Sequence, residues 1–359
     1  MSFLLAGFLV AYFFAFNVGA SGAAATMGTV YGAGVIKRKR IALILSGTGC
    51  LLGALWGGEV VETIGKGLIP EGALTIQVAT IILAVSAFTL YFTNMIGIPL
   101  STSEVTIGSI VGVGLSLQQI YLFNLLEIVL FWVLVPIISF LIVFIFVSLF
   151  NRLRKWFSFP ASNKVTKCLC FLLILTGFLE AFAAGMNNVA NAVGPLVGAG
   201  VLDKELGLLT GGIFIALGSI FLGGRVLETN GKKISHLTLS DGIMVSGTSG
   251  LLVIGASVFG IPIPMTQVTT SGIVGVGAAK DWKGIWRNQT IYQILKVWVT
   301  SPIISLVLAF SLTEIFLNSS FYNVAIISGG ILATLIITNF GRGAMLKKPF
   351  KEEMNYDSQ

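Results

Sequence analysis

Long apolar runs with almost no charge constrain this chain more than any other feature. Their lengths match the roughly 20 residues that a helix needs to cross the hydrocarbon core of a membrane. Only 10% of the residues are charged, against roughly 25% in a soluble globular domain. We therefore predict an all-α polytopic membrane protein with about 11 transmembrane helices. The apolar runs lie near residues 3–36, 41–61, 75–96, 98–116, 120–150, 168–202, 206–223, 242–260, 262–278, 291–317 and 322–341.

Two of these runs, 3–36 and 168–202, are too long for a single straight crossing. Both contain Gly-rich stretches, so we expect each to include an unwound or re-entrant piece. The runs lack the strand-like alternation of a membrane β-barrel, which disfavours that architecture.

The basic residues lie in short clusters between the apolar runs, at 37–40, 152–167, 232–233, 280–287 and 342–351. If each run crosses once, all five clusters fall on one side of the membrane. By the positive-inside rule this side is cytoplasmic, which predicts a multi-pass cell-membrane protein with its N-terminus outside and its C-terminus in the cytoplasm. The net charge of +7 is not arranged as an aromatic-interleaved basic surface, so no nucleic acid is expected as a partner.

The chain contains an internal repeat. Shifted by 166 residues, Phe16–Val35 aligns with Phe182–Val201, and eight of the twenty pairs are identical. An offset of 163 aligns Gly97–Gly114 with Gly260–Gly277, with ten identical pairs out of eighteen. Self-similarity at a fixed offset indicates two related structural units.

The two units are expected to have opposite orientations, because five crossings separate equivalent segments. Inverted repeats with discontinuous helices are typical of secondary transporters, whose substrate site lies between the repeats near the membrane midplane. The predicted organisation is a first inverted repeat over 1–150, a cytoplasmic linker over 151–167, a second inverted repeat over 168–341 and a cytoplasmic tail over 342–359.

Both duplicated motifs combine small residues with hydroxyl and amide groups. Free amides at the start of a helix, supplemented by such side chains, are suited to binding an anion. The alternative is that small residues only permit close helix packing, which we expect for Gly28, Gly32, Gly108 and Gly112. The predicted substrate-binding residues are Ser21, Gly22, Asn187, Asn188, Asn191, Ser101, Thr102, Ser103, Thr266 and Gln267.

The stretch Gly185–Ala192 reads Gly-Met-Asn-Asn-Val-Ala-Asn-Ala. It resembles the Gly-Ala-Asn-Asp-Val-Ala-Asn-Ala signature of the inorganic phosphate transporter (PiT) family, and Pro99–Glu104 resembles that family's Pro-x-Ser-Thr-Thr-His motif. The resemblance covers nearly the whole chain. It implies an alternating-access carrier of a small inorganic oxyanion.

The departures from the family pattern bear on the substrate. Gly22 and Asn188 stand where the family has aspartates, and Glu104 and Gln267 stand where it has histidines. Phosphate keeps a proton that a carboxylate can accept, whereas sulfate keeps none and would be repelled. The pattern therefore resembles the sulfate permease branch of the family and implies sulfate import, with thiosulfate or other tetrahedral oxyanions left open.

The coupling ion is expected to be H⁺ rather than Na⁺, because the family's signature aspartates are associated with sodium binding. Glu62 and Glu228, which the repeat pairs, could instead anchor helices at the membrane interface. Arg225 could offset substrate charge or be a loop cation, and His236 is expected to be solvated. The candidate coupling residues are Glu62, Glu228 and Glu104, followed by Glu180 and Glu59.

Several alternatives stay open. Phosphate, coupled to Na⁺ or H⁺, is the alternative substrate, and an anion channel is the alternative class because of the Gly-rich apolar segments. We find no nucleophile, base and orienting group at workable spacing, so an enzyme is not expected. The cysteines, Cys50, Cys168 and Cys170, have no metal-binding spacing, and no metal or other cofactor is expected. Membrane lipid is an expected partner, and a homodimer is left open.

Overall fold

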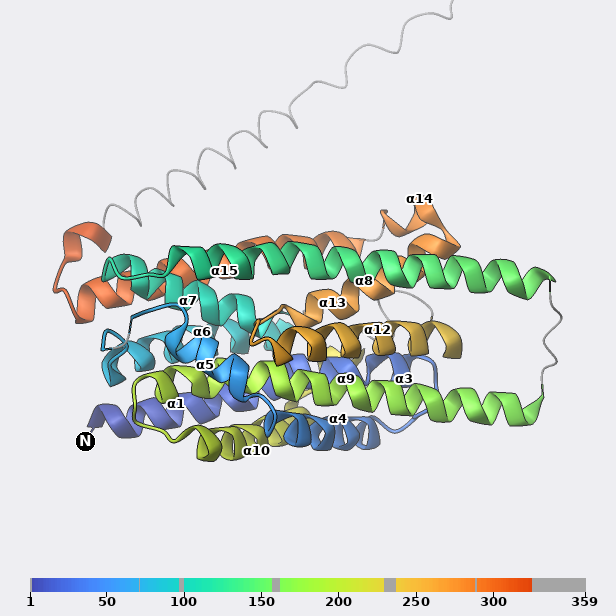
Figure 1. Cartoon of the computed structure of the whole chain (residues 1–359), viewed down its shortest axis with the longest axis horizontal. Coiled ribbons are helices and arrows are strands. Elements are labelled where there is room, and N and C mark those ends of the chain that lie inside the picture. Colours follow the sequence, from blue (N-terminus) through green and yellow to red (C-terminus); the bar gives the residue numbers. More distant parts are fainter. Residues whose placement is uncertain are drawn as a thin grey trace, which may run out of the picture. The chain divides into compact units, whose positions relative to one another are not determined.

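A computed structural model describes residues 2–70, 72–96, 100–156, 162–228, 237–287 and 289–324. All labelled elements in these residues are helices, as the sequence predicts (Figure 1). The chain divides into two compact units, Met1–Phe310 and Ser311–Gln359, and the first contains the site. The elements are α1 Ser2–Val18, η1 Gly19–Ala23, α2 Ala24–Thr26, α3 Gly28–Gly32, α4 Lys39–Ala54, α5 Gly58–Lys66, α6 Ile76–Ile96, α7 Thr102–Ser116, α8 Leu122–Trp156, α9 Asn163–Gly198, α10 Lys204–Leu222, α11 Gly224–Glu228, α12 Leu239–Val258, α13 Met265–Lys280, α14 Trp282–Ile285 and α15 Gln289–Phe316.

Among the described residues, six helices are long and apolar enough to cross a membrane. Helices α4 and α5, which meet at 70°, could supply a seventh span. The predicted number of eleven is therefore not reached by length and composition. One reason is that runs 98–116 and 262–278 form helices of only 15 and 16 residues, α7 and α13. Most of run 322–341 lies outside the described residues.

Run 3–36 departs from a regular α-helix, but it is not unwound before Met27, because Phe3–Thr26 forms one continuous helix. Within it α1 passes into the π-helical turn η1, Gly19–Ala23, and the helix ends at Met27, between α2 and α3. Single π-helical turns inside α-helices occur frequently at functional sites. The π-helical turn therefore falls on the first copy of the duplicated motif.

The expectation of an unwound or re-entrant piece is wrong for run 168–202. Its residues up to Gly198 belong to α9, one unbroken helix of 36 residues, which is about 54 Å long. Gly185 is used for close packing rather than for a break, because a Cβ placed there would lie 1.9 Å from the Cys50 carbonyl oxygen of α4. Asn187 and Asn188 therefore do not lie at the start of a half-helix with free backbone amides. Their contribution comes from their side chains.

The two halves pack in an equivalent manner. A Cβ placed on Gly19 would lie 1.9 Å from the carbonyl oxygen of Ile215 in α10, which parallels the contact of Gly185 with α4. Gly19 and Gly185 are 166 residues apart, the offset of the repeat. Helices α1 and α9 run in opposite directions (Figure 1), as inverted repeats require.

Helices α7 and α13 both begin beside the C-terminal half of α9, at Asn187 and Asn188. The side chain of Ser101 caps α7 by accepting from Glu104 N. Helix α13 follows a turn in which Gly260 has φ +70°, a left-handed conformation that glycine adopts without strain. The two helices lead away from α9 in opposite directions (Figure 1). They are the discontinuous helices that the second duplicated motif predicts.

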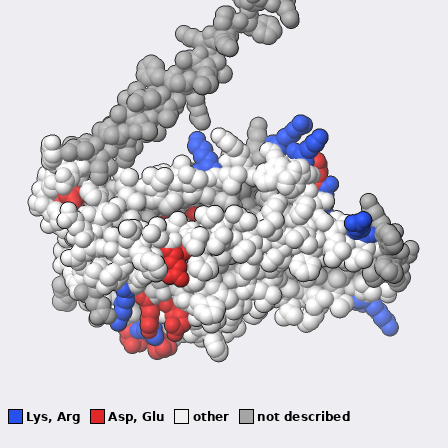
Figure 2. Space-filling view, turned by 45° about the horizontal axis from the view of Figure 1, so that its top comes forward, with Lys and Arg blue, Asp and Glu red and all other residues white. Residues whose placement is uncertain are grey.

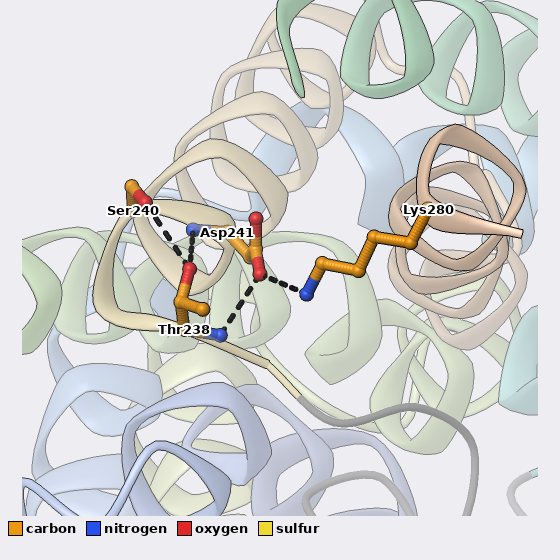
Figure 3. A network of polar contacts seen from close by, with 4 residues as sticks. All are labelled: Thr238, Ser240, Asp241 and Lys280. Carbon is orange, nitrogen blue, oxygen red and sulfur yellow. Dashed lines mark hydrogen bonds and ion pairs between the residues drawn. The ribbon is translucent and has the colours of Figure 1, made fainter. Parts of the chain in front are cut away.

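A polar network joins the start of α12 to the end of α13 (Figure 3). Thr238 and Asp241 form a reciprocal capping box, in which Thr238 N donates to Asp241 Oδ2 at 2.9 Å. Lys280 of α13 donates to the same oxygen. The Asp241 side chain is only 6% exposed, whereas that of Lys280 is 35% exposed. The ammonium group therefore compensates a carboxylate that is largely withdrawn from water.

We expect Lys280→Met to destabilise the protein by about 1–2 kcal/mol, because Asp241 keeps its capping bonds but loses its cation. The exposed Lys283 of α14 provides a matched control, and Lys283→Met should change the stability by less than about 0.5 kcal/mol. Thermal unfolding in detergent measures both variants. Equal melting temperatures would show that the Asp241–Lys280 pair contributes nothing.

Basic side chains gather at the end of the first unit where this network lies. Exposed cations occur at the α3–α4 connection, at the α8 and α9 ends and on α14: Lys37, Arg38, Arg40, Arg152, Lys164, Lys167, Lys283 and Arg287. Figure 2 shows Lys and Arg near α14 and a group of both signs at the opposite end, with mostly uncharged surface elsewhere on this face. Three of the five predicted clusters, 37–40, 152–167 and 280–287, are at least partly described; 232–233 and 342–351 lie outside the described residues.

Candidate functional site

Asn187, in the C-terminal half of α9, holds the turn that precedes α13. Its side chain is completely buried. Its Nδ2 donates to the carbonyl oxygen of Ile263 at 2.9 Å, and its Oδ1 accepts from Ile263 N at 3.1 Å. This two-bond pairing satisfies a backbone segment that is not helical and fixes where α13 begins.

Asn188 and Asn191 connect α9 to the first turn of α7. Thr102 Oγ1 donates to Asn188 Oδ1 at 2.9 Å. Asn191 Nδ2 lies 3.2 Å from both Thr102 Oγ1 and Ser103 Oγ. The first intrahelical backbone bond of α7 runs from Val105 N to the Ser101 carbonyl oxygen. The backbone amides before Val105 N have no intrahelical backbone partner, and such amides at the start of a helix stabilise an anion.

The first copy of the motif reaches the same place. Ser21 Oγ of η1 donates to the Leu100 carbonyl oxygen, just before α7, at 3.2 Å. Gly22 faces Asn188, because a Cβ on Gly22 would lie 2.6 Å from Asn188 Nδ2. Gly22 and Asn188 are equivalent in the repeat, so the two copies meet at their corresponding residues. The absence of a side chain at Gly22 makes room for the amide of Asn188.

Glu104 and Gln267, which the repeat also pairs, contact each other. Gln267 Nε2 of α13 donates to Glu104 Oε1 of α7. Both side chains are buried, and Glu104 forms no ion pair among the described residues. A buried carboxyl group without a cation is far less costly when it is protonated.

Four buried oxygen atoms around this cluster have no hydrogen-bond partner within the described chain: Asn191 Oδ1, Glu104 Oε2, Thr266 Oγ1 and Thr270 Oγ1. Buried polar atoms are normally satisfied, so unpaired ones in a cluster indicate a place for water, a proton or a ligand. The hydroxyl groups of Thr266 and Thr270 can donate as well as accept.

The ten predicted binding residues are therefore brought together, from η1, α7, α9 and α13, in the buried interior. Their roles differ in detail: Ser101 caps α7, Asn187 orders the Ile263 turn, and Thr266 has an unpaired hydroxyl oxygen. The site offers hydroxyl and carboxamide donors, with helix starts of α7 and α13 close by. Such a set can solvate an anion without a metal or an ammonium group.

Two of the predicted coupling residues lie elsewhere. Glu62 of α5 accepts from Lys204 at 2.7 Å, and its side chain is 53% exposed. Glu228 pairs with Lys39, and its side chain is 39% exposed. Both glutamates are thus in surface ion pairs, as their alternative role at the membrane interface requires.

The remaining sequence candidates are also outside the cluster. Glu59 lies in the first turn of α5, and Arg225 of α11 donates to the Met95 carbonyl oxygen. His236 falls outside the described residues. Glu104 is the one member of the leading coupling set, Glu62, Glu228 and Glu104, that lies at the polar cluster.

Sequence reasoning missed the carbonyl and amide of Ile263 and the hydroxyl of Thr270. The backbone of Ile263 has no residue-type signal, although the Gly260-Ile-Pro-Ile-Pro turn marks a non-helical segment there. Thr270 lies one helical turn after Thr266 on the same face of α13, so helical spacing could have found it.

Helices α7, α9 and α13 and the turn η1 meet at a buried cluster of polar donors, which defines a polytopic membrane protein with an internal polar site. A model of the Phosphate transporter family matches residues 18–309. The chain belongs to this family of membrane transporters, which points away from an enzyme.

Individual relatives agree with this assignment. Sulfate permease CysP of Bacillus subtilis (strain 168) is 49% identical over 331 residues, which cover 92% of this chain and 92% of that protein. A solved structure described as the sodium-dependent phosphate transporter has a TM-score of 0.71 at 27% identity, covering 88% of this chain and 100% of the other. The resemblance to the PiT family is thereby confirmed.

Proposed function

We propose that this protein is a secondary active transporter that imports sulfate across the cell membrane by alternating access, in symport with protons. The observation that carries the proposal is the uncharged polar cluster formed where Gly22 and Asn188 replace the family's aspartates. A fully deprotonated dianion is suited to donors that bear no negative charge. The 49% identity to a protein named sulfate permease supports the same substrate.

Glu104 is the proposed proton carrier at the anion site. It belongs to the first turn of α7, one residue after Ser103, and one of its carboxyl oxygens has no partner in the described structure. An ionised carboxyl group here would repel sulfate, so the anion and a proton on Glu104 stabilise each other. Release of the proton then favours release of the anion.

The proposed orientation places the basic end of the first unit in the cytoplasm. Exposed cations gather there, whereas the opposite end also bears Glu59, Glu62 and Glu205. The positive-inside rule assigns the cation-rich end to the cytoplasmic side. The N-terminus of α1 then lies outside.

Uptake into proteoliposomes tests the function directly. Purified protein should accumulate radiolabelled sulfate when the exterior is acidic, and a protonophore should abolish accumulation while sodium has no effect. At tenfold excess, unlabelled sulfate should compete with labelled sulfate at least about ten times better than unlabelled phosphate does. A tenfold difference in affinity corresponds to about 1.4 kcal/mol.

The alternative substrate and class have distinct outcomes in the same assay. Phosphate that competes as well as sulfate would make the protein a phosphate transporter, in line with the family name and the solved relative. Counterflow of labelled sulfate against an internal unlabelled pool is expected of a carrier. A channel would show no counterflow.

A further inference from the structure

Glu180 of α9 is a second buried carboxyl group, outside the polar cluster at Asn188. Its side chain is completely buried. Thr269 of α13 donates its hydroxyl group to Glu180 Oε1. Glu180 Oε2 has no hydrogen-bond partner among the described residues. One carboxyl oxygen is thus satisfied, and the other is positioned to hold a proton.

No cation compensates this carboxyl group within the described chain. Lys39 pairs with Glu228, and Lys280 pairs with Asp241. The Cys50 thiol donates to the carbonyl oxygen of Ala181 rather than to Glu180. Helices α5 and α10 pack on the C-terminal part of α9, through contacts at Gly194 and Val193. The ionisable side chains on the elements near Glu180 are Tyr31 on α3, Lys39, Arg40 and Cys50 on α4, Asp241 on α12 and Lys280 on α13.

An ionised Glu180 would therefore be an uncompensated charge in the protein interior. The cost of burying such a charge is large enough that the group takes up a proton instead. A purely structural role would be met as well by glutamine, which could accept from Thr269 without ever changing its charge.

The position of Glu180 links it to the anion site without making it part of that site. Asn187 follows on the same face of α9 seven residues later, about 10 Å along the helix. Thr269 belongs to α13, two residues after Gln267. A change of charge at Glu180 thus acts on the two helices that supply Asn187 and Gln267.

Hydroxyl groups lead from Glu180 toward the basic end of the first unit. Ser246 of α12 lies beside the carboxyl group, and its Oγ is 2.6 Å from Thr29 Oγ1 of α3. Thr29 in turn lies next to Gly242, the neighbour of Asp241 at the start of α12. Hydroxyl groups both accept and donate protons, so this row can connect Glu180 with that end.

We propose that Glu180 binds a second transported proton, at a site separate from the anion pocket. This inference rests on the proposed sulfate–proton symport. Glu104 and Glu180 each take up one proton when the site faces outward and release it inside. Two protons balance the two negative charges of sulfate, so one transport cycle moves no net charge.

The steady-state accumulation ratio measures the number of coupled protons. With the membrane potential clamped at zero, each coupled proton multiplies the limiting accumulation ratio of sulfate by about ten per pH unit across the membrane. Wild-type protein should approach about 100-fold accumulation for one pH unit, and Glu180→Gln about tenfold. At equal pH on both sides, Glu180→Gln should still exchange sulfate at a rate within about threefold of wild type, because the anion pocket is unchanged.

The outcomes separate the inference from the function on which it rests. Wild-type protein that accumulates no sulfate would refute the proposed function. If wild type accumulates about 100-fold and Glu180→Gln does the same, Glu180 has only a structural role and the inference is wrong. Wild type limited to about tenfold would also overturn it, since only one proton is then coupled.

A second variant covers the case in which Glu180→Gln does not fold. Glu180→Asp retains a titratable carboxyl group and is expected to retain the higher accumulation limit, although with slower exchange. Glu62→Gln removes an exposed glutamate that pairs with Lys204, and serves as a matched control that should keep the wild-type limit. Loss of the higher limit in Glu62→Gln alone would assign the second proton to Glu62 instead.

Discussion

Asn188→Asp should lower kcat/KM for sulfate at least about 100-fold. The substitution preserves the shape of the Asn188 side chain, which is 2% exposed, and keeps an oxygen that accepts from Thr102. It adds a negative charge beside a dianion. At an effective dielectric constant of 20, two unit charges 4 Å apart interact by about 4 kcal/mol, and sulfate has two. Initial rates of sulfate uptake in proteoliposomes measure the effect.

Asn124→Asp is the matched control. Asn124 of α8 is exposed, and its side chain donates to the Gly67 carbonyl oxygen rather than to any residue of the polar cluster. It should retain sulfate uptake within about threefold. Phosphate should also compete relatively better in Asn188→Asp than in wild type, since a protonated oxyanion can donate to the new carboxylate. Wild-type rates in Asn188→Asp would place Asn188 outside the anion pathway.

Gly185→Ala should be severely damaging, because Gly185 is one of two glycines through which the backbones of α4 and α9 touch. A Cβ on Gly185 would lie 1.9 Å from the Cys50 carbonyl oxygen, and one on Gly53 would lie 1.8 Å from that of Phe182. The two helices therefore touch through backbone atoms on both sides of the contact, and neither can yield locally. We expect a loss of about 3 kcal/mol or more in the free energy of unfolding.

Thermal unfolding in detergent, followed by the recovery of monodisperse protein, measures this loss. Gly255→Ala on α12 is the control, since a Cβ there meets no atom within 4 Å. Alanine also favours a helix over glycine by about 1 kcal/mol, so this control should be neutral or stabilising. Similar melting temperatures for Gly185→Ala and Gly255→Ala would mean that α4 and α9 separate easily.

The all-helical class and the meeting of Ser21, Gly22 and Asn188 could be predicted from the sequence. The apolar runs indicate membrane-spanning helices. The internal repeat indicates a structural symmetry that composition alone does not reveal. Pairing by the repeat offset even matched Glu104 with Gln267, which contact each other in the structure. The other residues of the site could be predicted from the resemblance to the family's sequence motifs.

The number of spans and the path of α9 could not be predicted. A Gly-rich segment such as Gly185–Gly194 reads equally as a break or as a surface for close packing, and only the partner helix α4 decides between them. Run 262–278 was predicted to be a crossing, yet its helix starts inside the protein, where the side chain of Asn187 holds Ile263. The contact of Glu180 with Thr269 has no local sequence signal, because the two residues are 89 positions apart.

A crystal structure with selenate, a tetrahedral analogue of sulfate whose selenium is located by anomalous scattering, tests the central claim most directly. We predict one selenium position between η1 and the starts of α7 and α13, with its oxygen atoms within hydrogen-bond distance of Asn188 and of the first turn of α7. Selenate bound elsewhere, with the side chains of Asn188, Thr102 and Ser103 still packed only against one another, would contradict the account.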